Sequence, residues 1–393
     1  MGYNFIDDCG FMLALGRAGL RSDSKISGEK IYGDYCYTAA GENFCIILSY
    51  KGDIHTEVLD IPSEICGKRV IGIANGAFSD LYDLKCAVIK KGVAAIGRKA
   101  FFQCCSLINV SIPETVSYIG YKAFYNCESL RFAVIPEGVT EIQPFTFYNC
   151  GSLERVDMPV SMRIIGESAF GFCSGMKEIY LNENIISVEC GSFQNCVSLK
   201  KINIPNALTE IEDSAFAFCS SLEEAIIPSN IQRIGDHAFF GCSEMKKLDI
   251  SAGLRKIGAF SFALCEKLER VYLPDTVTSV DEKAFAQCKS AESIRLSQKL
   301  TAIGNNAFNG CCALREIVIP GSVKNVGEQA FCDCESLRSV IVQDGVENIV
   351  DGAFDKCISI ASVELCDSLN TIGDKAFCFA QSVFSNDSRD FAL

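Results

Sequence analysis

Histidine is too scarce in this sequence to suggest an acid–base active site. The chain has two histidines, His55 and His237. His237 precedes Ala238 and Phe239 at a variable position of a repeat, which predicts an exposed turn residue. A catalytic triad requires a histidine beside a serine or cysteine nucleophile, and no such partner stands out for either histidine. The carboxylates are scattered over variable positions, and no two of them stand out as a glycosidase pair.

Cysteine is abundant, and its placement argues for packing rather than for chemistry. No Cys-x-x-Cys pair occurs among the 23 cysteines, whereas the common zinc sites require one. Twelve cysteines recur at one position of a repeat, and they are Cys104, Cys127, Cys150, Cys173, Cys196, Cys219, Cys242, Cys265, Cys288, Cys311, Cys334 and Cys357. Buried free cysteine packs as a small hydrophobic residue. We therefore expect these twelve thiols to be reduced and buried, with no metal site and no cofactor.

Phenylalanine sets the period of this pattern, because it recurs every 23 residues without insertion or deletion. The fourteen members are Phe78, Phe101, Phe124, Phe147, Phe170, Phe193, Phe216, Phe239, Phe262, Phe285, Phe308, Phe331, Phe354 and Phe377. A fixed period of this length indicates a solenoid, in which each coil packs only on its neighbours. We expect the rings of Phe124, Phe147 and Phe170 to stack in successive coils.

One repeat, residues 119–139, indicates how a coil folds. Phe124 and the residues three and six positions later share one face of a short helical turn. The residues nine and eleven positions after Phe124 form the inward side of a strand, and a proline ends the strand at position twelve. Glycine after position eighteen permits a tight bend. The sequence thus predicts an α/β repeat solenoid, a right-handed array of 23-residue coils with a parallel β-sheet on the concave side and short helical turns on the convex side.

The repeat resembles a known family. The unit Ile-Gly-x-x-Ala-Phe-x-x-Cys-x-x-Leu-x-x-Val-x-Ile-Pro-x-x-Val is similar to the treponemal-type leucine-rich repeat of BspA-like proteins, and residues 57–377 match it throughout. The resemblance implies a leucine-rich-repeat array. It also implies a protein on the surface of anaerobic bacteria or certain protists, associated with adhesion to host or bacterial proteins.

The pattern along the chain predicts four segments. Residues 1–34 lack the period and are expected to form a flexible leader. Residues 35–69 are expected to form an N-terminal β-hairpin cap and the first strand, because β-rich runs flank residues 41–43. Residues 70–383 hold the leucine-rich repeats, and residues 384–393 form a C-terminal tail.

Charge and hydropathy argue against two classes of partner. The net charge of −13 opposes nucleic acid, which requires a face rich in Lys and Arg. No apolar run reaches the roughly 20 residues of a membrane-spanning helix. Asp7 and Asp8 precede the apolar residues 11–15, where a secretory signal would carry basic residues. We therefore expect no signal peptide, so that both a cell-surface and a cytoplasmic location stay open, and we expect a monomer.

The concave strand face is the surface expected to bind a partner, because side chains eight and ten positions after each phenylalanine point outward there. Aromatic residues and arginine are enriched at interface hot spots. The residues predicted to bind a partner are Phe132, Val134, Arg155, Tyr180, Arg270 and Tyr272. Because β-propensity alone also favours aromatic residues on strands, a purely structural role for them stays open.

The sequence as a whole predicts a non-enzymatic module that binds a protein ligand, whose identity it does not give. By resemblance, the module would be an adhesin-like protein of the cell surface. One alternative is an intracellular protein-interaction scaffold that uses the same surface. A second alternative, from another class, is a hydrolase that uses carboxylates of the concave face.

Overall fold

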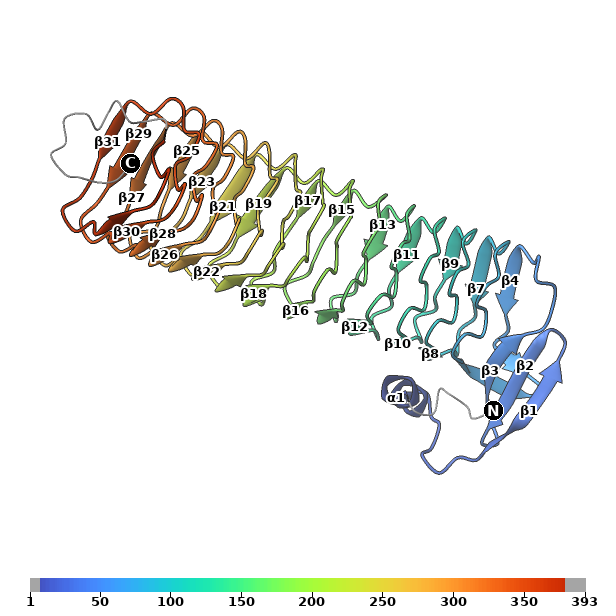
Figure 1. Cartoon of the computed structure of the whole chain (residues 1–393). Helices are drawn as coiled ribbons and strands as arrows, with labels where there is room; N and C mark the ends of the chain where they lie inside the picture. The colour runs from blue at the N-terminus through green and yellow to red at the C-terminus, as the bar shows by residue number, and fades with distance from the viewer. Residues whose placement is uncertain (1–7, 379–393) are drawn as a thin grey trace. The chain divides into compact units, whose positions relative to one another are not determined.

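A computed structural model describes residues 8–378 of the chain. The chain divides into two compact units, Met1–Leu199 and Lys200–Leu393, which we call unit 1 and unit 2. Within each unit, the strands of successive coils lie side by side (Figure 1). Ala380, Val383 and the expected tail at 384–393 lie outside the described residues.

In unit 1 each coil contributes two strands, which we call odd and even strands after their labels. The odd strands are β7 (Cys86–Ile89), β9 (Asn109–Ser111), β11 (Phe132–Val134), β13 (Arg155–Asp157) and β15 (Glu178–Ile179). The even strands are β8 (Ala95–Ile96), β10 (Tyr118–Ile119), β12 (Glu141–Ile142), β14 (Ile164–Ile165) and β16 (Ser187–Val188). Strand β4 (Val58–Ile61) precedes the odd strands in a parallel sheet of order β13-β11-β9-β7-β4, and β12, β14 and β16 form a second parallel sheet.

Unit 2 repeats the arrangement. Its odd strands are β17 (Lys201–Ile202), β19 (Glu224–Ile227), β21 (Lys247–Ile250), β23 (Arg270–Tyr272), β25 (Ser293–Arg295), β27 (Glu316–Ile319), β29 (Ser339–Val342) and β31 (Ser362–Glu364). Its even strands are β18 (Glu210–Ile211), β20 (Arg233–Ile234), β22 (Lys256–Ile257), β24 (Ser279–Val280), β26 (Ala302–Ile303), β28 (Asn325–Val326), β30 (Asn348–Ile349) and β32 (Thr371–Ile372). The even strands form one eight-stranded parallel sheet. The partners in this sheet are residues 23 apart, such as Ile211 and Ile234.

The phenylalanine ladder forms the centre of the core, as predicted. The ring centroids of Phe124 and Phe147 lie 5.4 Å apart with an interplanar angle of 5°, and those of Phe147 and Phe170 lie 5.5 Å apart at 1°. This separation is close to the distance of about 4.8 Å between paired strands, so the strand pairing also sets the ring spacing. In unit 2, Phe262 and Phe285 stack in the same way at 5.1 Å.

The segment that carries each phenylalanine consists of hydrogen-bonded turns, where the sequence analysis expected short helical turns. In one coil, the amides of Ala123 and Tyr125 donate to the carbonyls of Gly120 and Lys122. The alternate amides, including that of Phe124, donate to carbonyls of the next coil. Lys122 and Asn126 have positive φ values of 56° and 58°. These left-handed residues interrupt every helical turn, so that half of the amides bond between coils.

The glycine of the Ile-Gly step has a different role from the expected bend. Gly120 does not have a positive φ. A Cβ atom at Gly120 would lie 2.7 Å from the backbone nitrogen of Arg98 in the preceding coil. Glycine at this position therefore allows two coils to approach closely, whereas the bend itself is made by the left-handed residues that follow.

The cysteine ladder is buried, as predicted. All twelve side chains belong to the core. The Cys127 thiol donates to the carbonyl oxygen of Phe101 at an Sγ–O distance of 3.2 Å, and the Cys150 thiol donates to that of Phe124 at the same distance. Each thiol thus links its coil to the preceding one. The described cysteines form no disulfide.

The N-terminal region extends the even-strand sheet beyond the first coil. Its strands are β1 (Ile26–Tyr32), β2 (Tyr35–Ala40), β3 (Phe44–Tyr50), β5 (Glu64–Ile65) and β6 (Lys68–Ile73). Strands β2 and β3 form an antiparallel hairpin, and the sheet order is β1-β2-β3-β6-β8-β10. This hairpin lies within residues 35–69.

The segment expected to be a flexible leader contains regular structure in its described part. Helix α1 (Cys9–Arg17) and strand β1 lie within residues 8–34. The helix buries Phe11, Ala14 and Leu15 in a cluster with Ile71 and Ala95. These apolar side chains recur at the spacing of one helix face, which gives the segment a reason to fold. No helix within residues 8–378 is long and apolar enough to cross a membrane.

Candidate functional site

The exposed face of the odd strands in unit 1 carries four of the six predicted binding residues. Strand alternation turns Ala133 of β11 into the core and leaves its two neighbours outside. Phe132, Val134 and Tyr180 are 47%, 62% and 68% exposed. The parallel register places Phe132 beside Arg155 of β13. Two of the predicted residues are therefore direct neighbours on adjacent strands.

Arg155 is not a free cation. Its Nε atom lies 2.6 Å from Oδ1 of Asp157, two residues further along β13. Arg131 lies over the Phe132 ring at 5.8 Å from its centroid and also binds Glu154 at 2.7 Å. Both arginines are thus paired with carboxylates. The exposed aromatic rings are therefore the groups of this surface most available to contact a partner.

The other two predicted residues, Arg270 and Tyr272, lie on β23 of unit 2. Val271 between them is buried, and both flanking side chains are exposed. The register places Arg270 beside Ser293 and Tyr272 beside Arg295 of β25. Neither Arg270 nor Arg295 has a carboxylate within ion-pair distance in the described part of the chain.

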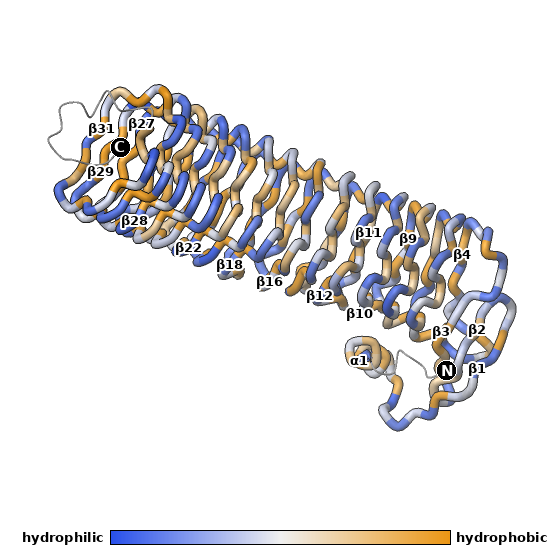
Figure 2. Tube along the Cα trace, viewed as in Figure 1, coloured by the Kyte–Doolittle hydropathy of each residue, from blue (hydrophilic) through white to orange (hydrophobic). Residues whose placement is uncertain are grey.

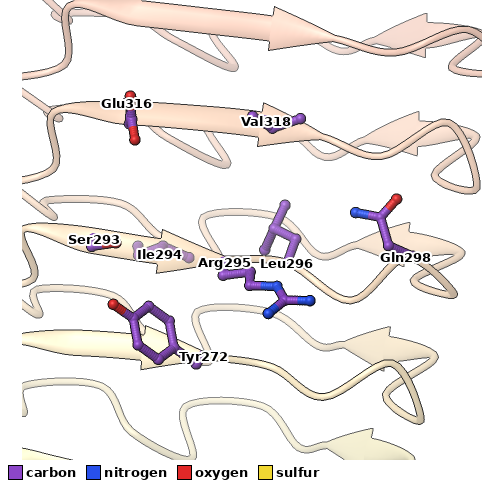
Figure 3. A pocket seen from close by; sticks show the side chains of 8 residues that line it. All are labelled: Tyr272, Ser293, Ile294, Arg295, Leu296, Gln298, Glu316 and Val318. Atoms are coloured by element: carbon purple, nitrogen blue, oxygen red, sulfur yellow. The ribbon is translucent and has the colours of Figure 1, made fainter.

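Tyr272 borders a shallow hollow of about 450 Å³ (Figure 3). Its lining residues are Tyr272, Ser293, Ile294, Arg295, Leu296, Gln298, Glu316 and Val318. In Figure 3 the Arg295 side chain lies between those of Tyr272 and Gln298. Unpaired guanidinium donors beside a phenol ring and an aliphatic wall suit a partner side chain that ends in a carboxylate or carbonyl group. Arg295, Gln298 and Glu316 were not among the predicted site residues.

A second hollow, of about 550 Å³, lies in unit 1 beside the start of the odd strands. Its charged lining residues already bind one another, because Arg131 and Lys177 both contact Glu154, at 2.7 Å and 3.6 Å. The hydrogen bond from Arg131 lowers the pKa of Glu154. A ligand in this hollow would have to compete with these ion pairs, so we regard the Tyr272 hollow as the better site.

Neither histidine belongs to an odd strand. His55 is exposed, and its Nδ1 atom lies 2.6 Å from Oδ2 of Asp83, which raises the pKa of His55. His237 stacks on Phe260 at a centroid distance of 4.8 Å. Within residues 8–378, no three His, Cys, Asp or Glu side chains are grouped so that they could hold a metal ion.

Comparison with known proteins identifies the repeat. The family model described as BspA type leucine-rich repeat region matches residues 59–176, 140–269 and 255–383. The chain belongs to this family. A search of curated proteins found no match.

Solved structures of this fold come from several bacteria. A leucine-rich-repeat protein from Bacteroides ovatus is 23% identical, with a TM-score of 0.69 over 88% of this chain and 91% of that one. A leucine-rich cell surface protein from Faecalibacterium prausnitzii is 24% identical, with a TM-score of 0.51 over 92% and 98%. The pneumococcal vaccine antigen PcpA is 18% identical, with a TM-score of 0.56 over 89% and 88%. At these identities the likeness shows the leucine-rich-repeat fold.

Proposed function

We propose that this chain is a non-enzymatic module that binds a protein ligand through the exposed face of its odd strands. The observation that carries the proposal is the pairing of Tyr272 with Arg295 on adjacent strands, beside a shallow hollow. An aromatic ring and an unpaired guanidinium group held by rigid strands lose little conformational freedom on binding. In unit 1, Phe132, Val134 and Tyr180 offer a second exposed apolar surface.

The ligand can be identified by photo-crosslinking from the proposed surface. A photoreactive phenylalanine derivative in place of Tyr272 should capture the ligand in the native cell extract. The same derivative in place of Val350, which is 37% exposed and follows β30, is the matched control. Equal capture from both positions would contradict the proposal that the odd-strand face is the binding surface.

A finer proposal places the protein on the cell surface as an adhesin-like molecule. Its support is the family resemblance and the cell surface protein of Faecalibacterium prausnitzii that shares the fold. The alternative is an intracellular scaffold with the same binding face. Cell fractionation distinguishes them, because an adhesin is labelled on intact cells by an impermeant reagent and a scaffold is not.

The hydrolase alternative has weaker support. Lys247 binds Asp249 at 2.7 Å on β21, and Arg155 binds Asp157 on β13, so these carboxylates of the odd strands are already paired. A glycosidase pair requires two carboxyl groups in different environments across a substrate cleft. Turnover that is abolished by one carboxylate substitution would overturn the non-enzymatic proposal.

A further inference from the structure

The turns of unit 1 carry a row of aromatic rings outside the core ladder. Phe102, Tyr125, Tyr148 and Phe172 follow one another with centroid distances of 5.2, 5.1 and 5.2 Å. Phe172 is 38% exposed, and the other three are half-buried. This row lies on the turns that follow the core phenylalanines, whereas the proposed ligand face lies on the odd strands.

Three cations lie among these rings. The Nζ atom of Lys122 lies 5.0 Å from the ring centroids of Tyr121, Tyr125 and Phe145. Lys99 lies over Phe102 at 5.0 Å, and Arg98 lies over Tyr121 at 5.3 Å. We call the four-ring row and these three cations the basic-aromatic patch.

The cations of the patch differ from most others on the repeats of unit 1. Lys85, Lys91 and Lys177 each bind a carboxylate of a neighbouring coil. No carboxylate of the described residues lies within ion-pair distance of Arg98, Lys99 or Lys122. The patch is therefore a local excess of positive charge in a chain whose net charge is −13.

Backbone strain at two rings of this surface, Phe145 and Phe172, argues against a purely structural role for the row. Phe172 has a φ of 62°, which is unfavourable for a bulky side chain. At the same position of the repeat, Asn126, Asn149 and Asn195 adopt the same conformation, which asparagine tolerates better. An exposed phenylalanine in a strained conformation, where asparagine would fit, is the kind of local conflict that accompanies a binding role.

The ring geometry indicates which class of partner the patch suits. Interplanar angles of 17° and 8° show that Phe102, Tyr125 and Tyr148 cover one another's faces. Nucleic-acid bases need free ring faces on which to stack, and these rings do not offer them. The ring edges that stay accessible carry the positive part of the aromatic quadrupole, which favours carboxylate oxygens. The neighbouring backbone is already paired, because the Asp80 amide donates to the Phe102 carbonyl and the Phe145 amide donates to the Glu167 carbonyl.

We propose that the basic-aromatic patch binds an acidic segment of a partner protein, with carboxylates on Arg98, Lys99 and Lys122 and aliphatic side chains against the rings. The site is separate from the odd-strand face and does not depend on the function proposed for that face. Charge complementarity and aromatic anchors are the two features that protein interfaces combine.

Selection from a random peptide library on the immobilised full chain tests the proposal, followed by fluorescence anisotropy with an enriched peptide. We expect enriched peptides to combine Asp or Glu with aliphatic residues. The triple variant Arg98→Gln, Lys99→Gln, Lys122→Gln should bind such a peptide at least tenfold more weakly. The charge-matched control Lys85→Gln, Lys91→Gln, Lys177→Gln should change the affinity less than twofold, because its cations are already paired.

A second variant separates binding from folding. Phe172→Asn should weaken peptide binding without lowering the melting temperature, because asparagine relieves the left-handed backbone. Enriched peptides without acidic residues, or equal binding by the triple variant and its control, would overturn the proposal. So would patch-dependent binding of poly(dT) or of phosphatidylserine vesicles in place of acidic peptides.

Discussion

At the scale of single residues, the cysteine ladder combines packing with a hydrogen bond. A sulfhydryl group fills a small apolar space and still donates to the carbonyl of the preceding coil, as Cys150 does toward Phe124. Burial raises the pKa of Cys265 and of Cys311 to about 12. Thiolate is the reactive form of cysteine, so these thiols are poor nucleophiles in the folded protein.

Thiol labelling should therefore divide the cysteines into two groups. In the native protein, an alkylating reagent at pH 8 should modify the exposed Cys66 quickly. The twelve ladder thiols should react only after denaturation, without any reductant. Ladder cysteines that are already disulfide-bonded in freshly purified protein would contradict this prediction.

The same pKa shifts predict a loss of stability in alkaline solution. A thiol whose pKa is raised in the folded state stabilises the fold fully below its unfolded pKa of about 9. Above pH 9 the unfolded chain releases the proton first, so the free energy of unfolding falls by roughly 1.4 kcal/mol per pH unit for each such thiol, up to the folded pKa. Urea denaturation between pH 8 and 10.5 should show a steep decline.

The alanine variant of several ladder cysteines is the control for this decline. Alanine at these positions should lower the free energy of unfolding at pH 8, because each substitution removes a thiol hydrogen bond worth about 1 kcal/mol. Its stability should nevertheless depend less on pH between 9 and 10.5. An equal pH dependence in the variant would show that other groups cause the decline.

At the scale of elements, docking of α1 depends on a small set of specific contacts. Asp8 caps the helix by accepting from the amide of Phe11, and its second oxygen accepts from the Tyr118 hydroxyl at 2.8 Å. Burial and this carboxylate raise the pKa of Tyr118. A Cβ atom at Gly10 would lie 2.3 Å from the Tyr118 ring, so glycine is required for this close approach.

Two glycines of the same helix provide a matched test of this docking. Gly10→Ala should displace α1 or the Tyr118 ring and destabilise the docked state by about 1–3 kcal/mol. Gly16→Ala should stabilise the helix by up to about 1 kcal/mol, because nothing lies within 4 Å of its Cβ position. Hydrogen exchange of residues 9–17 measures both. Equal protection in the two variants would show that Gly10 is not packed as described.

These elements also show where prediction from sequence reached its limit. The strand positions could be predicted from period-2 alternation, because assigning the inward residues also determines which side chains point outward. The turns were mistaken for helical turns because apolar spacing of three fits both, although the asparagines at 126 and 149 signal left-handed backbone. The apolar residues of helix α1 have helical spacing, but a helix of nine residues is too short to be stable unless it packs against another part of the protein. That partner, around Gly72 and Ala95, lies far along the chain.

At the scale of the whole molecule, exact repetition makes the fold predictable and the function difficult to predict. Inward positions carry the same residue types in every coil, so the sequence alone reveals the core. Outward positions vary from coil to coil, so a binding role has to be argued for each residue separately. The exposure of Phe132, Tyr180 and Tyr272 followed from alternation. The ion pair of Arg155 with Asp157 could not be predicted from alternation, because it depends on a side-chain rotamer. Arg295 could have been found from its place 23 residues after Tyr272.

The charge on the repeats adds little stability. Ion pairs such as Lys267–Glu244 and Lys289–Glu266 join residues 23 apart at 2.6 Å and 2.8 Å. Exposed pairs of this kind contribute at most about 1 kcal/mol each. Hydrophobic and hydrophilic residues alternate along the coils (Figure 2), and burial of the hydrophobic ones is thus the main source of stability. The exposed strand face can therefore change without loss of the fold.

The measurement that tests the central claim most directly is an affinity titration with the ligand that crosslinking identifies. It compares the unmodified protein with Tyr180→Ala, Tyr272→Ala and the double variant, with a melting curve for each. Both tyrosines are exposed, so the melting temperatures should not change. Each substitution should weaken the affinity by roughly 1–3 kcal/mol if the odd-strand faces bind the ligand. Unchanged affinity in the double variant, with an unchanged melting temperature, would contradict the account and place the binding site elsewhere.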